Sequence, residues 1–263
     1  MQPTKFDAPA TEVHGLSSPK DAAQWDALGK ILEQYPHGLS HILSHWPCYT
    51  RRINVLRFLA HFKLFEQVYQ LPGDIVEIGV SRGVSLFTWH KLLEIFNPCD
   101  TSKKAIGIDS FEGLQSFNEK DGALDPRIGK SEGGWSAASV ENEIELLAAW
   151  QNADNILARE RVILKKGRVE QVLKPLLESR PGMRINLLHL DVDLYEPTLY
   201  SLRHLWDLVV PGGIVVFDEY GLPPWGGEGS AVDEFLRERS LGHLKIEKFP
   251  WSLTPNGFLV KRG

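Results

Sequence analysis

The chain has 263 residues, of which 43% are hydrophobic and 24% charged, and these proportions are ordinary for one large globular domain or two small ones. Its net charge of −5 excludes a basic surface for nucleic acid, and no run reaches the roughly 18 apolar residues of a membrane span. Two cysteines, Cys48 and Cys99, cannot form a disulfide framework or a thiolate zinc site, so a cytoplasmic protein with no membrane partner is expected.

Polar residues and prolines dominate the start of the chain. Residues 1–20 lack the apolar core of a signal peptide and are predicted to be a loose arm. Helices are predicted over residues 21–70, because apolar residues recur at helical spacing, most clearly over residues 53–69. We expect residues 1–70 to form an N-terminal arm and helical extension, and residues 71–263 to form the main domain.

Strands and helices are predicted to alternate along the main domain. Apolar segments with the length and composition of strands occupy residues 74–78, 105–108, 161–164, 185–190 and 213–217. Helical patterns follow them over residues 85–96, 139–150, 169–178, 198–208 and 231–239. This alternation predicts parallel strands joined by right-handed crossovers, with helices on both faces of the sheet.

The last two predicted strands, residues 244–249 and 257–261, break this alternation. The segment between them is too short for a crossover helix, so an antiparallel hairpin is expected. The predicted fold class is therefore α/β, with a seven-stranded Rossmann-like sheet, a C-terminal antiparallel hairpin and an N-terminal helical extension.

Two apolar runs of the main domain stop on acidic residues. The run LLHLDVDLY carries Asp191 and Asp193, and the run IVVFDEY carries Asp218 and Glu219. At the carboxyl end of a strand such side chains can face a crevice where ligands bind. Carboxylates that come close repel each other unless a cation joins them, and oxygen ligands favour Mg²⁺. The alternative is that these acids cap loops or the next helix.

The first predicted strand runs into a glycine-containing turn. Glu77 is followed by Gly79 and Gly83, which permit a tight turn, and by a helix start whose free N–H groups can bind an anion. Glu77 can pair with a cationic or hydroxyl-bearing part of a ligand. Asp109, at the end of the second strand, can accept hydrogen bonds from ribose hydroxyls, or it can cap the turn before Phe111. Two glycines after a strand often form only a turn, so this motif alone is weak.

Four pieces of the chain, followed by SAVDEF, resemble the macrocin O-methyltransferase family: DIVEIGVSRGVS, GIDSFEGL, LHLDVDLYEPT and PGGIVVFDEYG. They occur in the family's order, and the resemblance covers residues 49–239. The family comprises class I S-adenosylmethionine-dependent enzymes that methylate hydroxyls, typically on sugars of natural products. The resemblance implies a methyltransferase domain over residues 71–263, the cofactors S-adenosyl-L-methionine and Mg²⁺, and a small-molecule acceptor that is a sugar or glycoside.

The resemblance also implies roles for single residues. It assigns Asp193 as general base, with Asp191 beside it in catalysis. The implied metal ligands are Asp191, Asp218 and Glu219. The implied cofactor-binding residues are Glu77, Gly79, Ser81, Gly83, Ser85, Asp109, Ser110 and Gly167. Glu219 departs from the second aspartate that the family usually has, and the loop GLPPWGGEGS is expected to shape the acceptor pocket.

The implied reaction is a direct displacement at the methyl group of a sulfonium. Mg²⁺ bound to two adjacent hydroxyls of the acceptor would lower their pKa and fix their angle to the methyl group. Asp193 would take the proton as the oxygen attacks. Replacing Asp191 with Ala is expected to abolish metal-dependent turnover and to leave cofactor binding largely intact.

Two other classes of protein stay open at this point. One is a nicotinamide-dependent oxidoreductase on a Rossmann-type sheet, against which the terminal hairpin and the paired carboxylates argue. The other is a non-catalytic relative that binds only cofactor and partner. The N-terminal helices could cover the acceptor pocket or form the face of a homo-oligomer, and the sequence leaves both open.

Histidines are the alternative candidates for functional residues. His189 lies inside a predicted strand and is interpreted as a packed core residue. His37, His41 and His45 recur every four residues and are expected on one helical face. A zinc site needs further convergent ligands, and the sequence gives none that must converge there.

Overall fold

The structure is a computed structural model of the chain, and it describes residues 19–157 and 159–262. A six-stranded sheet forms its centre, in the order β3-β2-β1-β4-β5-β6. The first five strands pair in parallel, and β6 is antiparallel to β5. The strands are β1 (Asp74–Ile78), β2 (Ala105–Asp109), β3 (Val162–Lys166), β4 (Ile185–Leu190), β5 (Val209–Phe217) and β6 (Gly257–Val260).

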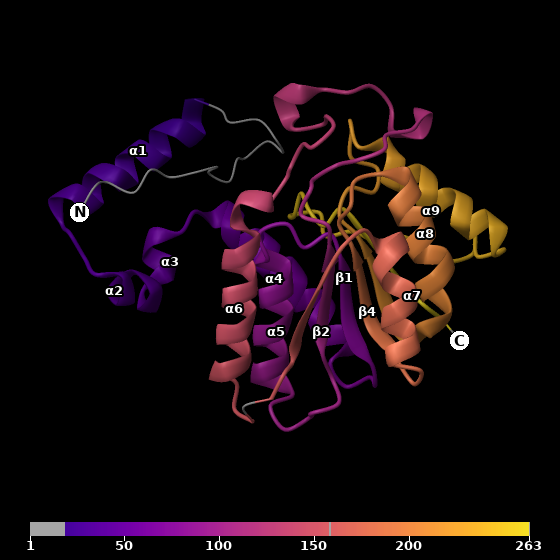
Figure 1. The fold of residues 1–263 in the computed structure, drawn as a ribbon. Helices are drawn as coiled ribbons and strands as arrows, with labels where there is room; N and C mark the ends of the chain where they lie inside the picture. Colours follow the sequence, from indigo (N-terminus) through magenta and orange to yellow (C-terminus); the bar gives the residue numbers. More distant parts are fainter. Residues whose placement is uncertain (1–18, 158, 263) are drawn as a thin grey trace.

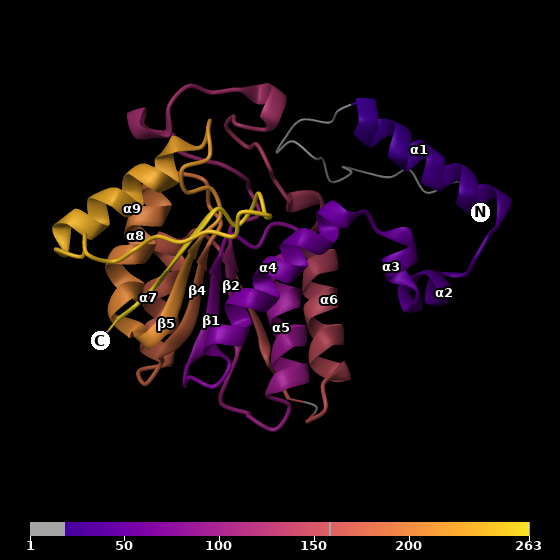
Figure 2. The same cartoon turned by 180° about the vertical axis from the view of Figure 1, so that it is seen from behind.

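Helices cover both faces of this sheet, as the alternation predicted (Figure 1). One face carries α4 (Arg52–Val68), α5 (Val84–Phe96) and α6 (Glu141–Asp154), which share an apolar core with the strands. The other face carries α7 (Val169–Ser179), α8 (Tyr195–Leu205) and α9 (Gly226–Glu238), with a second apolar core. Figure 2 shows α4 lying beside α5 against the sheet.

Short 3₁₀ helices complete the secondary structure. Three of them follow β2, before α6 begins: η1 (Glu119–Asp121), η2 (Pro126–Ile128) and η3 (Ala138–Val140). The fourth, η4 (Trp206–Leu208), leads from α8 into β5.

The register of the strands brings the ends of four of them to one edge of the sheet. Every residue of β1 and β4 is buried, as expected for parallel strands covered on both faces. Ile78, the last residue of β1, pairs with Ile108 on one side and with Leu190 on the other. Leu190 in turn pairs with Phe217 of β5. The residues that follow these four positions therefore meet in a single region.

The predicted seven-strand count is wrong, because residues 19–157 and 159–262 form six strands in this sheet. Residues 244–249 form no strand and contribute only one isolated antiparallel bridge, between Glu247 and Phe258 of β6. Pro250 follows this segment and lacks the N–H that would extend the ladder. The antiparallel pairing of the C-terminal strand is confirmed, although its extended partner is β5.

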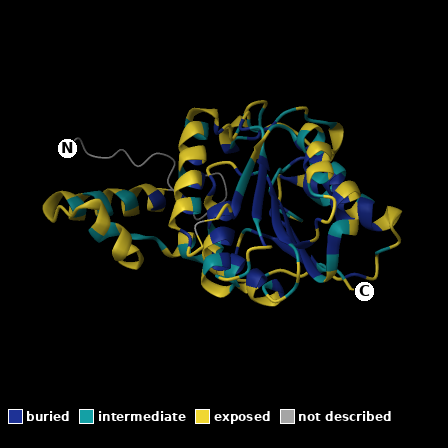
Figure 3. Cartoon of the chain, turned by 60° about the horizontal axis from the view of Figure 1, so that its bottom comes forward, coloured by how far each residue is buried: buried dark blue, intermediate teal, exposed yellow. Residues whose placement is uncertain are grey.

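Three N-terminal helices stand away from the sheet: α1 (Pro19–Gln34), α2 (Leu39–Ser44) and α3 (Trp46–Tyr49). Figure 3 shows them as a largely exposed projection beside the buried strands. Asp21 is the buried residue of α1, and α2 and α3 have none. By contrast, α4 buries Leu64 and Phe65 completely in the core. The helix α4 is thus part of the packed body, and the domain boundary near residue 70 stays a prediction.

Most of the arm predicted over residues 1–20 lies outside the described residues, and α1 begins at Pro19. No helix in the described ranges is long and apolar enough to cross a membrane.

Candidate functional site

A cavity of about 370 Å³ opens where the carboxyl ends of the parallel strands meet. This is the edge at which open α/β sheets bind their ligands, and the volume lies within the range of small-molecule sites. Its wall includes most of the residues predicted for a site: Gly79, Ser81, Ser85, Asp109, Ser110, Gly167, Asp191, Asp193, Asp218 and Glu219.

The turn after β1 passes so close to β4 that only glycine fits at its centre. Gly79 has φ +92°, and a Cβ atom there would lie 1.8 Å from the backbone oxygen of Asp191. The backbone N–H of Asp191 in turn donates to Ile78 at 2.8 Å. The turn that borders the cavity therefore packs directly against the backbone at Asp191 and is hydrogen-bonded to it. Gly83, also at positive φ, is the N-cap of α5.

Asp109 fixes the same turn from the other side. One of its carboxylate oxygens accepts the backbone N–H groups of Val80 and Ser81, each at 2.7 Å. The other oxygen accepts the N–H of Phe111 at 2.7 Å. The turn-capping interpretation of Asp109 is thus correct in this structure. A contact from Asp109 to a ribose stays a prediction.

Glu77 does not line the cavity. It is 1% exposed, and its Oε2 lies 3.5 Å from Nδ1 of His189 on the neighbouring strand. The register explains this, because Glu77 and His189 are paired positions of β1 and β4. Glu77 is therefore not among the residues that line the cavity, and the cofactor contact predicted for it stays a prediction.

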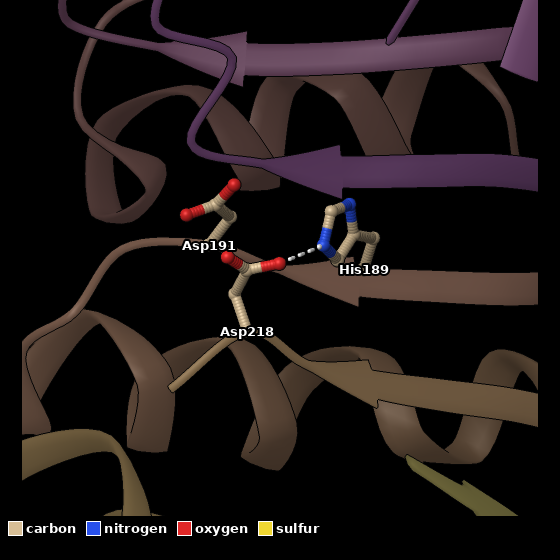
Figure 4. A group of neighbouring side chains, drawn as sticks. All are labelled: His189, Asp191 and Asp218. Carbon is tan, nitrogen blue, oxygen red and sulfur yellow. Dashed lines mark hydrogen bonds and ion pairs between the residues drawn. The ribbon is translucent and has the colours of Figure 1, made fainter. Parts of the chain in front are cut away.

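His189 links Glu77 to the acidic site. Its Nε2 lies 3.3 Å from Oδ1 of Asp218 (Figure 4). Burial lowers the pKa of His189, but hydrogen bonds and charges of Asp218 and Glu77 outweigh burial and raise it to about 10. His189 is thus a packed core residue, as predicted, and its imidazole also lies between the carboxyl groups of Glu77 and Asp218.

A second cation, Arg57 of α4, completes a row of alternating charges. Its Nη1 donates to Oδ2 of Asp218 at 2.8 Å, and its Nη2 donates to Oδ2 of Asp191 at 2.8 Å. Starting from Glu77, acidic and basic side chains therefore alternate through His189, Asp218 and Arg57 to Asp191. Despite burial, the charges of Arg57 and His189 hold the pKa of Asp218 well below its usual range.

The pKa values of the other carboxyl groups of the site are raised. Burial and the charge of Asp218 raise the pKa of Asp191 to about 7. Burial and the charges of Asp191 and Asp218 raise the pKa of Asp193, and a hydrogen bond with Glu219 opposes this shift. Burial and the charge of Asp193 raise the pKa of Glu219. The cavity thus holds an excess of carboxyl groups, which favours a cationic ligand.

The donor atoms can be tested against the predicted metal. One ligand atom each of His189, Asp191 and Asp218 lies within 4.8 Å of the others, and the two carboxylates suit Mg²⁺ in kind. Figure 4 shows both carboxylates at the ends of their strands and facing one region. The convergent set contains His189 where Glu219 was expected. In addition, Arg57 already contacts one oxygen of each carboxylate.

Arg57 was missed in the sequence, although a signal was present. It lies within the apolar stripe predicted for residues 53–69, with Leu56 and Phe58 as its neighbours. A charge on the packing side of a helix needs a buried partner, so the sequence could have predicted a buried ion pair for Arg57. Its partners could not have been named, because they lie more than a hundred residues away along the chain.

The rings of His37, His41 and His45 stack in a row, although only His41 lies inside α2. The ring centroids of His37 and His41 are 4.1 Å apart, and those of His41 and His45 are 4.3 Å apart. They are not among the convergent ligand groups found in the described part of the chain. The zinc alternative gains no support from them.

The long segment between β2 and α6 closes over one side of the cavity. Leu114 and Trp135 of this segment line the cavity wall. Lys130 anchors the segment, because its buried ammonium donates to the backbone oxygens of Asp121 and Pro224. Trp225, from the loop expected to shape the acceptor pocket, is 1% exposed and packs in an apolar cluster with Leu114. That loop therefore supports the wall.

Comparisons with known proteins agree with this geometry. The family model described as Macrocin-O-methyltransferase (TylF) matches residues 46–249. An 8-demethyl-8-(2,3-dimethoxy-alpha-L-rhamnosyl)-tetracenomycin-C 4'-O-methyltransferase of Streptomyces olivaceus is 28% identical over 68% of this chain and 64% of its own length. The chain thus spans less than two thirds of that relative. Mycinamicin III 3''-O-methyltransferase of Micromonospora griseorubida is 25% identical over 81% of this chain and 77% of its own length.

Solved structures repeat the fold of this chain. The crystal structure of CalS11, a calicheamicin methyltransferase, superposes with a TM-score of 0.84 at 25% identity and covers 97% of this chain and 98% of its own. The O-methyltransferase NovP superposes with a TM-score of 0.61 at 23% identity, over 80% of this chain and 81% of its own.

Proposed function

Since the chain belongs to the macrocin-O-methyltransferase family, we propose that it transfers the methyl group of S-adenosylmethionine to a hydroxyl of a sugar or glycosylated natural product. The observation that carries the proposal is the convergence of Asp191, Asp193 and Asp218 on one cavity bordered by the Gly79 turn. Relatives named as O-methyltransferases of glycosylated compounds support the class of acceptor.

The proposed cofactor site is the half of the cavity next to the Gly79 turn. We assign Gly79, Ser81, Asp109, Ser110 and Gly167 to it, with Ser85 at the border with Arg57. Gly83 does not line the cavity, and we keep its predicted cofactor role as a proposal on the ground that it is the N-cap of α5 beside this turn. The excess of carboxyl groups on the opposite wall supports a donor that carries a positive sulfonium. We propose for Glu77 an indirect role, in which it holds His189 charged and in place.

S-adenosylmethionine supplies an electrophilic methyl group when bound. In the proposed mechanism the acceptor oxygen forms a bond to this carbon as the sulfur–carbon bond breaks, and Asp193 takes the hydroxyl proton. The raised pKa of Asp193 suits a general base, because it brings the proton affinity of the carboxylate closer to neutral pH. The remaining task of the chain is to hold both substrates in line and exclude water.

Mg²⁺ dependence is part of the proposal. Asp191 and Asp218 would hold the ion together with Glu219, and the ion would lower the pKa of the acceptor hydroxyl. The oxygen donors of Asp191 and Asp218 support this assignment. In the structure, however, Arg57 already contacts one oxygen of each of these two carboxylates.

The experiment is a screen for transfer of a labelled methyl group to sugars and glycosides, with Mg²⁺ or excess chelator. We expect activity with Mg²⁺ and its loss in chelator. In Asp193→Asn, kcat is expected to fall by about 10²- to 10⁴-fold, the usual contribution of a general base. Binding of S-adenosylhomocysteine, measured by calorimetry, is expected to persist in this variant.

The matched control is Asp154→Asn, the same chemical change at an exposed residue of α6, and it is expected to retain full activity. Full turnover of Asp193→Asn would remove the assigned base. Cofactor binding without turnover on any acceptor would favour the non-catalytic relative. The family match leaves the nicotinamide-dependent oxidoreductase without support, and a parallel titration with NAD is expected to give no binding.

The cellular location and the oligomeric state of the protein are proposals as well. Cys48 and Cys99 are both exposed free thiols, which supports a reducing, cytoplasmic location. Exposed apolar side chains on α1 and α2, including Ile31, Leu39 and Leu43, support a homo-oligomer. Light scattering at several concentrations would measure the mass.

A further inference from the structure

Arg57 is held in the acidic site by four polar contacts. Besides Asp191 and Asp218, it donates to Oγ1 of Thr254 at 2.7 Å and to Oγ of Ser85 at 3.1 Å. These partners come from four different parts of the fold: the end of β4, the end of β5, the loop before β6 and the first turn of α5. The guanidinium therefore has a defined place between the two carboxylates.

A divalent cation held by both carboxylates would need the same region. The two oxygens that Arg57 contacts, Oδ2 of Asp191 and Oδ2 of Asp218, belong to the carboxylates that converge as candidate ligands. Mg²⁺ bound directly to such oxygens sits at about 2.0–2.1 Å. A guanidinium 2.8 Å from the same atoms would then lie against a second positive charge. Two cations that shared these oxygens would repel each other.

We propose that Arg57 is a built-in competitor for the metal-binding carboxylates, so that a divalent cation enters only by exchange with the guanidinium. This inference rests on the proposed function, because it concerns the metal site assigned there. In the metal-free protein Arg57 keeps Asp191 and Asp218 close together despite their repulsion. On exchange, one charge of +1 leaves the carboxylates and one of +2 takes its place.

The alternative role for Arg57 is structural, as a tie between α4 and the ends of the sheet. The two roles predict opposite changes in metal affinity. If Arg57 competes, its removal frees both carboxylates and metal binding becomes tighter. If Arg57 only holds the site together, its removal lets the carboxylates move apart and metal binding becomes weaker or stays the same.

The test is a titration of the full chain with Mn²⁺ alone, followed by electron paramagnetic resonance, which needs neither acceptor nor turnover. Arg57→Gln is expected to bind one Mn²⁺ at least tenfold more tightly than the unchanged protein. Arg57→Lys, which keeps the charge but loses the planar fork, is expected to lie between them. Lys63→Gln removes an exposed charge from the same helix and is expected to bind as the unchanged protein does.

A second measurement follows thermal unfolding with and without saturating Mn²⁺. Arg57→Gln is expected to have the lower melting temperature without metal and the larger increase with it. Equal or weaker Mn²⁺ binding by Arg57→Gln overturns the proposal, as does absence of binding in all variants. If Arg57→Gln does not fold, Arg57→Lys decides alone, and an affinity no higher than that of the unchanged protein overturns the proposal.

The same preparations are titrated with S-adenosylhomocysteine to keep the two proposals apart. Binding of this ligand with no gain in Mn²⁺ affinity rejects the role of Arg57 and leaves methyl transfer standing. A gain in Mn²⁺ affinity without S-adenosylhomocysteine binding supports the exchange at Asp191 and Asp218 and rejects the proposed methyl transfer.

Discussion

At the scale of single residues, several buried charged side chains of this protein are held by opposite charges. Arg161 is 1% exposed and meets Oε1 of Glu94 at 2.6 Å. His189 and Arg57 follow the same rule inside the candidate site. Removing one partner of such a pair leaves a charge that water cannot reach, and this costs far more than loss of a surface pair.

The pair of Arg161 and Glu94 gives a direct test. Glu94→Ala leaves the Arg161 guanidinium with the backbone oxygen of Asn97 but without the carboxylate that pairs with it, and we expect the free energy of unfolding to fall by about 3–5 kcal/mol. Chemical denaturation would measure the change. Glu178→Ala, which removes an exposed partner 4.0 Å from Lys174, is the matched control and is expected to have little effect. Equal effects of both substitutions would contradict the prediction.

At the scale of elements, strand register decides which side chains enter the site. Asp109, Asp191 and Asp218 reach one cavity because β2, β1, β4 and β5 are in matching register. Strand positions were predictable from the sequence because buried parallel strands are continuous apolar runs. The start of α9 at Gly226 was not predictable from the sequence, because two glycines there indicated a loop. The helix starts early since Gly227 leaves room for the Asp121 side chain, which accepts the N–H of Tyr195.

The close approach of the β1 turn to β4 leads to the next prediction. Gly79→Ala places a methyl group against the Asp191 backbone at a positive φ, so we expect the free energy of unfolding to fall by about 1–3 kcal/mol or more. Because the turn borders the cavity, the affinity for S-adenosylhomocysteine is expected to fall at least tenfold. Denaturation and calorimetry would measure the two effects.

Gly182→Ala is the control for this substitution, because a Cβ atom at Gly182 meets no atom within 4 Å. It is expected to leave both stability and affinity nearly unchanged. Unaltered ligand affinity in Gly79→Ala would show that the turn does not border the cofactor.

At the scale of the whole molecule, one packed body carries the site and three helices project from it. The fold class, the parallel order of the strands and the acidic edge were predictable because each follows from periodicity or from charge at strand ends. The row Glu77–His189–Asp218–Arg57–Asp191 was not predictable, because it joins residues of four elements (β1, β4, the end of β5 and α4) through distances that periodicity does not encode. The seventh strand was wrongly predicted because residues 244–249 make a single bridge to β6 and are followed by Pro250, which has no N–H to extend the pairing.

The projecting helices should be dispensable for the packed body. Deletion of residues 1–50 removes α1–α3, whose buried residue is Asp21, and in the described part of the chain the cavity wall begins at Arg57. We expect cooperative unfolding to persist, with a melting temperature changed by no more than about 4 °C, which corresponds to roughly 1 kcal/mol in a protein of this size. Calorimetric scans of both proteins would measure it. Loss of a cooperative transition would mean that these helices support the core.

Both outer edges of the sheet are guarded against other chains. At one edge β3 ends in Lys165 and Lys166, and Lys166 meets Glu141 of α6. At the other edge the bridge of Glu247 to Phe258 covers the free side of β6. Charged side chains and covering segments at such margins block the strand-by-strand stacking that leads to fibrils. Concentrated stocks of this protein should accordingly resist amyloid formation, which dye binding during prolonged storage would reveal.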